Sequence, residues 1–325
     1  MRDFRRNLLI GLLFGALVVA AMTLIGDLRQ ITSDLLKFQW GLLPLILGAS
    51  LVNFCLRFAK WHYFVRLTEH ADLAWRESAR VFLAGFPLVV TPGKIGEVLK
   101  GVWLNQATGI PVARGVTVVL AERISDGLAM TLLSVVGVIA FPRYWPAFAV
   151  AGSALVAAVV IFQLRPLALQ VLAGVRRLPW LRGFAGHLEE FYLGSSVLLR
   201  PKATLVGIAL GTLGWLAEGI GTYLVLVGLG VPPGIEALST CVFIYSFSTI
   251  VGTLSALPGG LGATEASMAG MLSALLRLDR GLAVTATLLL RFATLWFAVA
   301  IGLAVWSQSP ALLLPAKASP EMDTL

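Results

Sequence analysis

The sequence predicts an all-α integral membrane protein with six or more transmembrane helices and two re-entrant hairpins that form an inverted repeat. Hydrophobic residues make up 58% of the 325 residues and charged residues only 13%, whereas soluble proteins average roughly 25% charged. Several apolar runs reach about 20 residues, the length that crosses a bilayer. Two further apolar runs are each interrupted in the middle by Pro-Gly.

Six continuous apolar runs are the candidate transmembrane helices. They lie at residues 8–25, 41–59, 116–141, 146–164, 203–229 and 282–306. A basic start precedes the first run, but no small-residue cleavage site follows it, so we interpret this run as a retained anchor helix. Both cysteines, Cys55 and Cys241, fall within apolar runs, which indicates neither a disulfide framework nor a metal site.

The two interrupted runs, residues 81–104 and 237–276, contain related polar motifs. The first motif is Pro92-Gly93-Lys94-Ile95-Gly96-Glu97, and the second is Pro258-Gly259-Gly260-Leu261-Gly262-Ala263-Thr264-Glu265. Proline cannot donate to the preceding helix, and glycine permits a sharp turn. We therefore predict hairpin turns at Pro92, Gly93 and Gly96, and at Pro258, Gly259, Gly260 and Gly262. Free N–H groups at the start of each returning half-helix are suited to holding an anion.

The distribution of Lys and Arg predicts the orientation, because cytoplasmic loops are enriched in both. The N-terminus, the loop after the second helix and the stretch 165–202 are basic, and within that stretch residues 181–199 are predicted to form an amphipathic surface helix. A single pass by residues 81–104 would place the stretch 165–202 outside, whereas a re-entrant hairpin keeps it cytoplasmic. A hairpin at 237–276 enters from outside, since residues 230–234 lack Lys and Arg; a single span over 237–257 is the alternative.

The sequence thus predicts one transmembrane domain over residues 1–310, with repeat halves at about 81–141 and 237–306 and a short polar tail at 311–325. The expected location is the cell (inner) membrane, with the N-terminus in the cytoplasm. Inverted repeats with broken helices are typical of transporters, whose sites lie near the bilayer midplane.

Each repeat has a glutamate followed by an arginine at the same separation, from 97 to 123 and from 265 to 291. Charges at membrane depth are costly and indicate a working site. Arginine offers a planar fork for phosphate, so Arg123 and Arg291 are the predicted lipid-phosphate ligands, with Lys94 reaching the phosphate from the first turn. In the alternative, each arginine neutralises a nearby glutamate and only locks the helices together.

Five acidic residues are assigned gating or proton-coupling roles. They are Glu97, Glu265, Glu122, Asp126 and Glu218. Glu122 and Asp126 share one helical face, with solvation at the interface as the alternative. Glu218 has no evident partner in the sequence, and pairing with a cation from another helix is its alternative. Arg57 and Lys60 are expected to snorkel at a helix end.

Three motifs together resemble the flippase-like transmembrane family, named for the membrane region of lysylphosphatidylglycerol synthases. They are the first Pro-Gly motif, the run Ala121-Glu122-Arg123-Ile124-Ser125-Asp126, and Leu257-Pro258-Gly259-Gly260-Leu261-Gly262-x-x-Glu265. The resemblance implies a helical bundle with paired re-entrant hairpins that moves an anionic or modified lipid between leaflets. Relatives are associated with lipid-linked sugar and hopanoid pathways. The sequence ends at Leu325 without a soluble aminoacyl-transfer segment, so synthase activity is not implied.

We therefore expect a non-enzymatic translocator of a phospholipid, lipid-linked sugar or hopanoid, working through a midplane cavity with Glu/Arg pairs. The alternatives are an integral-membrane transferase for lipid-linked groups and a non-catalytic membrane partner of a separate lipid-modifying enzyme. The net charge of +8 comes from basic loops beside apolar spans, which indicates contact with anionic lipid and not with nucleic acid. The sequence lacks a G-x-x-x-x-G-K-[ST] loop and metal-ligand spacing, so no cofactor is expected.

Overall fold

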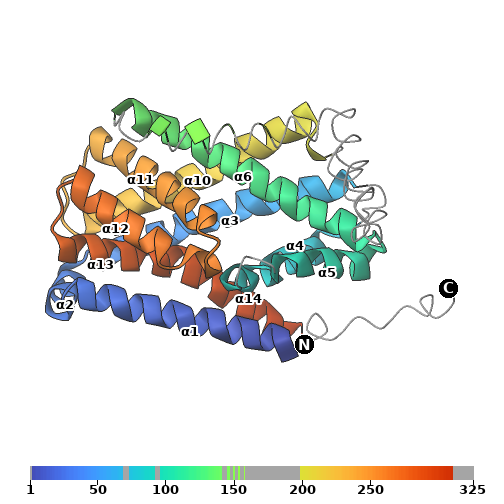
Figure 1. Ribbon diagram of the computed structural model, residues 1–325, viewed down its shortest axis with the longest axis horizontal. Coiled ribbons are helices and arrows are strands. Elements are labelled where there is room, and N and C mark those ends of the chain that lie inside the picture. The colour runs from blue at the N-terminus through green and yellow to red at the C-terminus, as the bar shows by residue number, and fades with distance from the viewer. Residues whose placement is uncertain are drawn as a thin grey trace, which may run out of the picture.

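The computed structural model describes residues 2–68, 73–91, 96–140 and 198–309, together with 145–146, 149–150, 153 and 157. Within these residues all regular structure is helical. The predicted tail at 311–325 and the turn residues Pro92, Gly93 and Lys94 lie outside the described residues, as do most of 146–164 and all of the predicted helix 181–199 except residues 198 and 199. The longer helices run along one axis of the bundle (Figure 1).

The chain begins with a helix pair that bends sharply. Helix α1 (Arg2–Ile25) runs along the bundle, and α2 (Leu28–Lys37) turns away from it by 93°. Asp27 sits at the bend with a φ of 60°, and its carboxylate accepts a hydrogen bond from the Arg29 N–H at 3.0 Å. This carboxylate satisfies one of the free donors at the start of α2.

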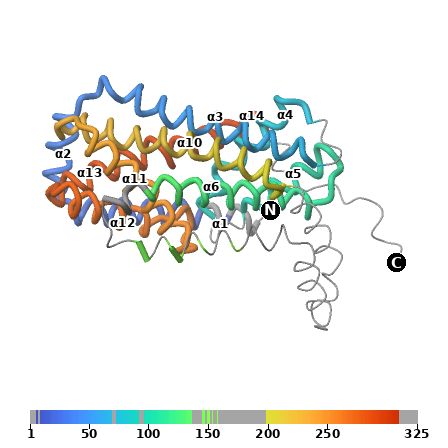
Figure 2. Tube along the Cα trace, turned by 90° about the horizontal axis from the view of Figure 1, so that it is seen from above, coloured from blue at the N-terminus to red at the C-terminus, as the bar shows by residue number. Residues whose placement is uncertain are grey.

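The remaining elements alternate long helices with short, broken ones. They are η1 (Trp40–Leu42), α3 (Leu43–Arg66), α4 (Trp75–Ala84), η2 (Phe86–Val90), α5 (Leu99–Thr108), α6 (Val112–Ala140), α10 (Pro201–Gly228), α11 (Ile235–Leu254), η6 (Pro258–Gly260), α12 (Ala263–Leu275), α13 (Arg280–Arg291), the π turn η7 (Phe292–Trp296) and α14 (Phe297–Gln308). Helix α10 packs between α3 and α6 (Figure 2).

Four helical stretches in the described part of the chain are long and apolar enough to cross a bilayer. They are Trp40–Arg66, Pro201–Gly228, Ile235–Leu254 and Arg280–Gln308, and the bent pair α1–α2 brings the number to five if it counts as one span. The helices predicted at 41–59, 203–229 and 282–306 are confirmed. The stretch Ile235–Leu254 is itself long enough to span, as the alternative for 237–257 requires. The presence of six or more transmembrane spans remains a prediction.

Two helical hairpins meet near the middle of the bundle. One consists of α4, η2 and α5 and the other of α11, η6 and α12, and they extend toward each other from opposite ends of the long axis (Figure 1). At the meeting point Val90 of η2 packs in one apolar cluster with Leu261, which follows η6. This arrangement is compatible with the predicted inverted repeat, and re-entry into the membrane remains a prediction.

The turns of both hairpins break the helices with glycine and side-chain hydrogen bonds. In the second, Gly259, Gly260 and Gly262 have φ values of 60°, 66° and 85°, in the left-handed region where glycine is unstrained. In the first, the Thr91 hydroxyl donates to the Leu88 carbonyl at 2.6 Å and accepts from the Gly96 N–H at 3.0 Å. Thr91 therefore links η2 to the chain that resumes at Gly96.

Gly11 of α1 allows this helix to approach the tip of the first hairpin. A Cβ atom at Gly11 would overlap the Val90 carbonyl oxygen, which belongs to the backbone and has little room to shift. We expect Gly11→Ala to destabilise the fold by about 1–3 kcal/mol, measured as a lower thermal unfolding midpoint in detergent. Gly48 of α3 faces open space, so Gly48→Ala is the matched control and should keep the midpoint or raise it slightly. Equal midpoints would show that α1 does not seat against the hairpin.

Candidate functional site

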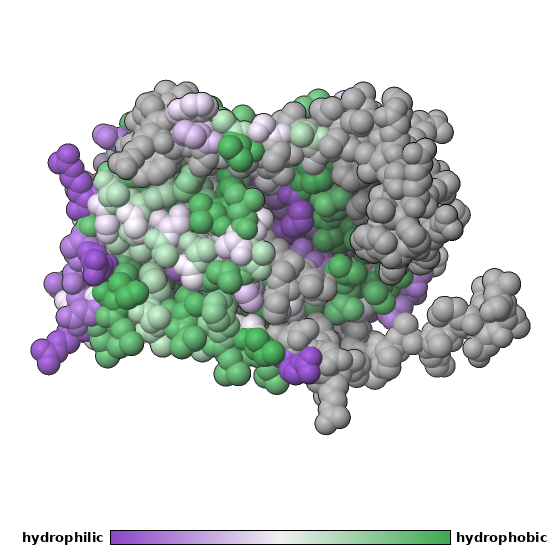
Figure 3. All heavy atoms as spheres, in the orientation of Figure 1, coloured by the Kyte–Doolittle hydropathy of each residue, from purple (hydrophilic) through white to green (hydrophobic). Residues whose placement is uncertain are grey.

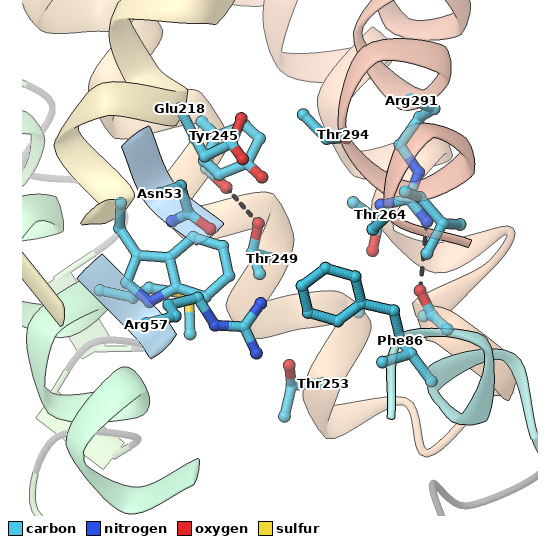
Figure 4. Close-up of a pocket in the computed structure, with 18 of the residues that line it drawn as sticks. Asn53, Arg57, Phe86, Glu218, Tyr245, Thr249, Thr253, Thr264, Arg291 and Thr294 are labelled. Carbon is cyan, nitrogen blue, oxygen red and sulfur yellow. Dashed lines mark hydrogen bonds between the residues drawn. The ribbon is translucent and has the colours of Figure 1, made fainter. Parts of the chain in front are cut away.

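A cavity of about 120 Å³ lies where the hairpin tips meet the long helices. Its charged lining residues are Arg57, Arg123, Glu218 and Arg291, which come from α3, α6, α10 and α13. Figure 4 shows Arg57 and Asn53 on one side of the cavity and Arg291 with Thr264 on the other. The two arginines predicted from the repeats therefore line one site, together with a third that was not predicted.

The face of the bundle drawn in Figure 3 is largely apolar between its two ends, where described residues are visible. Figure 3 shows hydrophilic residues gathered at the α2 end, and a further hydrophilic area recessed in a hollow near the middle of the face, between apolar regions. Large apolar side chains such as Leu13, Leu205 and Leu213 are more than half exposed, as lipid contact requires. The hydrophilic area near the middle of this face is thus recessed behind apolar surface.

Arg291, the last residue of α13, pairs with Glu265 in the first turn of α12. Its Nε lies 2.6 Å from Glu265 Oε1, and its Nη2 donates to the Gly259 carbonyl at 3.1 Å. The other glutamate oxygen, Oε2, accepts from the Gly262 N–H at 2.7 Å. These contacts hold the broken tip of the second hairpin against α13 and leave the arginine at the cavity wall.

Arg123 makes the corresponding pair in the first repeat. Its Nε lies 3.2 Å from Glu97 Oε2, and Glu97 comes just before α5, the returning helix of that hairpin. Arg123 is 26% exposed at its side chain and Glu97 3%. Both repeats therefore place a buried glutamate beside the hairpin turn and its arginine in the next helix.

Glu122 and Asp126 of α6 form the acidic centre of a larger buried network. Glu122 lies 3.2 Å from Arg57, 3.4 Å from Lys100 and 3.5 Å from Arg123. Both acids are buried, with Glu122 0% and Asp126 2% exposed. The alternative of interfacial solvation for these two acids is therefore wrong, because cations from α3, α5 and α6 surround them.

The expectation that Arg57 and Lys60 snorkel is also wrong. Lys60 is fully buried and its ammonium pairs with Asp126, while Arg57 stacks over Trp215 at 5.4 Å and contacts Glu122. Asp126 also accepts a hydrogen bond from the Trp215 indole at 2.9 Å. The apolar sequence around these two cations gives no sign of their acidic partners, which lie on α6.

Lys100 is a further buried cation that the motif search missed. Its ammonium lies 5.0 Å from the centre of the Trp61 ring and 5.2 Å from that of Phe82, and it contacts Glu122. Cation–π contacts of this kind are strongest when the cation is desolvated. The signal was present in the sequence, because Lys100 lies inside the interrupted apolar run 81–104 and meets the same criterion of charge at membrane depth.

Glu218 of α10 differs from the other predicted acids. It is 2% exposed and accepts a hydrogen bond from the Ser50 hydroxyl at 3.1 Å, but no lysine or arginine in the described part of the chain forms an ion pair with it. Arg57 and Arg291 act on Glu218 electrostatically from across the cavity. In the same described residues no group of three or more His, Cys, Asp or Glu is placed to hold a metal ion.

Comparison with known proteins gives one family and two relatives. The family described as "Lysylphosphatidylglycerol synthase TM region" matches residues 8–302, which include every cavity residue. A "UPF0104 membrane protein" of Methanothermobacter thermautotrophicus is 23% identical over 318 residues, covering 90% of this chain and 93% of that protein. A second protein of that name and organism is 37% identical over 93 residues, 29% of this chain and 27% of its own length. No solved structure matches.

Proposed function

Because this chain belongs to the lysylphosphatidylglycerol synthase TM region family, we propose that it moves an anionic or modified membrane lipid between the two leaflets. The observation that supports this proposal most is the convergence of Arg57, Arg123 and Arg291 on one cavity. Guanidinium groups bind phosphate through paired hydrogen bonds and stay charged at any physiological pH. The headgroup would enter the cavity while the acyl chains stay in the surrounding lipid.

The route that we propose uses the two hairpins as re-entrant elements of an inverted repeat with six or more spans. Their tips bring broken backbone and glycine to the middle of the protein, where the two Glu/Arg pairs hold them. A phosphate that replaces Glu265 on Arg291 would release the second tip, and one that replaces Glu97 on Arg123 would release the first. Alternate release of the two tips would open the cavity to one leaflet at a time.

The orientation belongs to the same proposal. We place the protein in the cell membrane with its N-terminus in the cytoplasm, where Arg2, Arg5 and Arg6 satisfy the positive-inside rule. The direct partners are then membrane lipids. A separate lipid-modifying enzyme is a further partner if the cargo is made at the same membrane.

Two alternatives remain from the sequence, and the site supports each of them less. A transferase for lipid-linked groups needs an acid or nucleophile that is free to act. Four of the five predicted acids, Glu97, Glu122, Asp126 and Glu265, are held in ion pairs, which leaves Glu218 in the cavity wall as the candidate acid for that alternative. A non-catalytic partner of a synthase needs no charged cavity, yet the cavity of this protein has three arginines in its wall.

The test is reconstitution of the purified protein into liposomes, followed by leaflet-access assays with labelled phosphatidylglycerol, its aminoacyl forms, polyprenyl-phosphate sugars and hopanoids. We expect faster movement of one phosphate-bearing class, reduced about tenfold or more in Arg57→Gln, because a hydrogen bond to a charged group contributes about 1.5–3 kcal/mol. Arg66→Gln is the matched control, since Arg66 is exposed at the end of the same helix. Movement of no class by the folded protein would overturn the proposal.

A further inference from the structure

Among the residues that the structure describes, the buried charges around the cavity balance. The charged cavity residues and the groups linked to them through ion pairs form one set, which we name the interior charge set. Its cations are Arg57, Lys60, Lys100, Arg123 and Arg291, and its acids are Glu97, Glu122, Asp126, Glu218 and Glu265. With five cations and five acids, the set has no net charge when every member is ionised. Balance is expected here, because an uncompensated charge in this environment is costly.

Glu218 is the member of this set that can change its charge without breaking an ion pair. Protonating any of the other four acids would break an ion pair with an arginine or lysine. Protonating Glu218 disturbs only the hydrogen bond from Ser50. A hydroxyl both donates and accepts, so Ser50 can rotate and accept from the protonated carboxyl.

The other ionisable groups near Glu218 do not offer a second site for the proton. The α-helices that pack against α10 contribute these groups: Arg57 on α3, Arg123 and Asp126 on α6, Cys241 and Tyr245 on α11, and Arg291 on α13. The three arginines keep their charge, and Asp126 is held by Lys60 and Trp215. Cys241 is buried in the apolar core cluster. Glu218 is thus the adjustable charge in the cavity wall.

We propose that Glu218 takes up one proton with each anionic headgroup, so that the protein carries a proton and the lipid anion across in the same direction. This inference rests on the proposed function. Protonation of Glu218 leaves the interior charge set with one uncompensated positive charge, which a headgroup with a single negative phosphodiester neutralises. The two binding events therefore favour each other, and by thermodynamic linkage the effect is reciprocal.

Proton uptake on binding tests the coupling without any transport step. The probe is dihexanoyl-phosphatidylglycerol, a soluble lipid with one phosphodiester, titrated calorimetrically into the full chain in detergent with buffers of different ionisation enthalpy. Uptake should approach one proton per probe in the pH range where Glu218 is ionised in the free protein and protonated in the complex, and should be smaller at pH values on either side of that range. Glu218→Gln should bind the probe with no uptake. Uptake that persists in this variant, or no uptake in the wild type at any pH, would overturn the proposal.

Ser50→Ala supplies a second variant that keeps the carboxyl group. The Ser50 hydroxyl binds the ionised carboxylate more strongly than the neutral carboxyl, because a hydrogen bond to a charged group is the stronger of the two. Removing it therefore makes protonation easier, and the uptake transition should move toward alkaline pH. A transition at the wild-type pH would contradict the assignment to Glu218. A probe that does not bind the folded wild type would contradict the anionic site itself, and with it the coupling.

Transport in liposomes separates this inference from the function on which it rests. A proton moving with a monoanion transfers no net charge, so wild-type lipid movement should respond to a pH gradient and not to a potassium diffusion potential. In Glu218→Gln the response to the pH gradient should vanish and a response to the potential should appear. Glu236→Gln, at an exposed acid in the first turn of α11, should behave as the wild type. Lipid movement that does not respond to the pH gradient would contradict the proton coupling but not the proposed function. Absence of any lipid movement would contradict the proposed function itself.

Discussion

Replacing Arg291 by glutamate should abolish lipid movement and destabilise the protein, whereas exchanging the partners in Arg291→Glu with Glu265→Arg should recover most of the stability and none of the movement. The wild-type pair has a separation of 2.6 Å, with Arg291 12% and Glu265 3% exposed. The single change places two buried carboxylates face to face, at a cost of about 3–5 kcal/mol. The exchange restores the attraction between opposite charges.

Lipid movement should not recover, because the two positions face different surroundings. Arg291 lines the cavity, and Glu265 instead accepts from the Gly262 N–H at 2.7 Å behind it. The exchanged protein therefore presents an acid to the headgroup phosphate, and its arginine cannot accept that backbone hydrogen bond, which costs about 1–3 kcal/mol. The thermal midpoint in detergent reports the stability and the leaflet-access assay the movement. Wild-type movement in the exchanged protein would mean that Arg291 is only a structural partner of Glu265.

The same exchange at Arg123 and Glu97 should recover less stability. Arg123 lies 3.2 Å from Glu97 but also 3.5 Å from Glu122 and 3.9 Å from Asp126. A glutamate at position 123 would face both of those acids as well as gaining the new arginine at position 97. The difference in recovered stability between the two exchanges therefore measures how strongly neighbouring charges, beyond the glutamate and arginine themselves, affect each pair.

The repeated glutamate and arginine were predictable because their spacing follows from the hairpin. In each repeat the glutamate precedes or begins the returning helix, and the arginine lies in the helix that follows: Glu97 and Arg123 around α5 and α6, Glu265 and Arg291 in α12 and α13. An antiparallel connection brings these positions side by side, so equal sequence separations produce equivalent contacts. The pairing could be anticipated from the sequence, whereas the shared cavity required the arrangement of both hairpins.

The network around Glu122 and Asp126 was not predictable in the same way. The apolar run 41–59 suggested that Arg57 and Lys60 lie at a helix end, but α3 continues to Arg66. At 1.5 Å per residue, Arg57 is roughly 14 Å from that end, too deep to reach solvent along the helix. Its acidic partners come from α6, a separate segment of the chain. A hydropathy pattern indicates how deep in the membrane a residue lies, but it does not identify a partner residue on another helix.

Replacing Lys60 by methionine should destabilise the fold by about 3–5 kcal/mol, the usual cost of removing one partner from a buried ion pair. Lys60 is fully buried and is the cation in closest contact with Asp126 in the described part of the chain. Arg57 and Arg123 both lie 3.9 Å from the other carboxylate oxygen. Methionine matches the length of the lysine stem, so most of the loss should come from the charge left on Asp126. Thermal or denaturant unfolding in detergent measures it.

Lys100→Met is the matched comparison and should cost less, about 1–3 kcal/mol. Glu122 is contacted by three cations, at 3.2 Å from Arg57, 3.4 Å from Lys100 and 3.5 Å from Arg123, so it keeps two of them when Lys100 is lost. Both lysines are buried, and therefore burial alone predicts equal effects. A clearly larger loss for Lys60→Met would show that the number of remaining partners sets the cost of an interior charge. Equal losses would instead mean that Asp126 is held by the distant arginines as firmly as by Lys60.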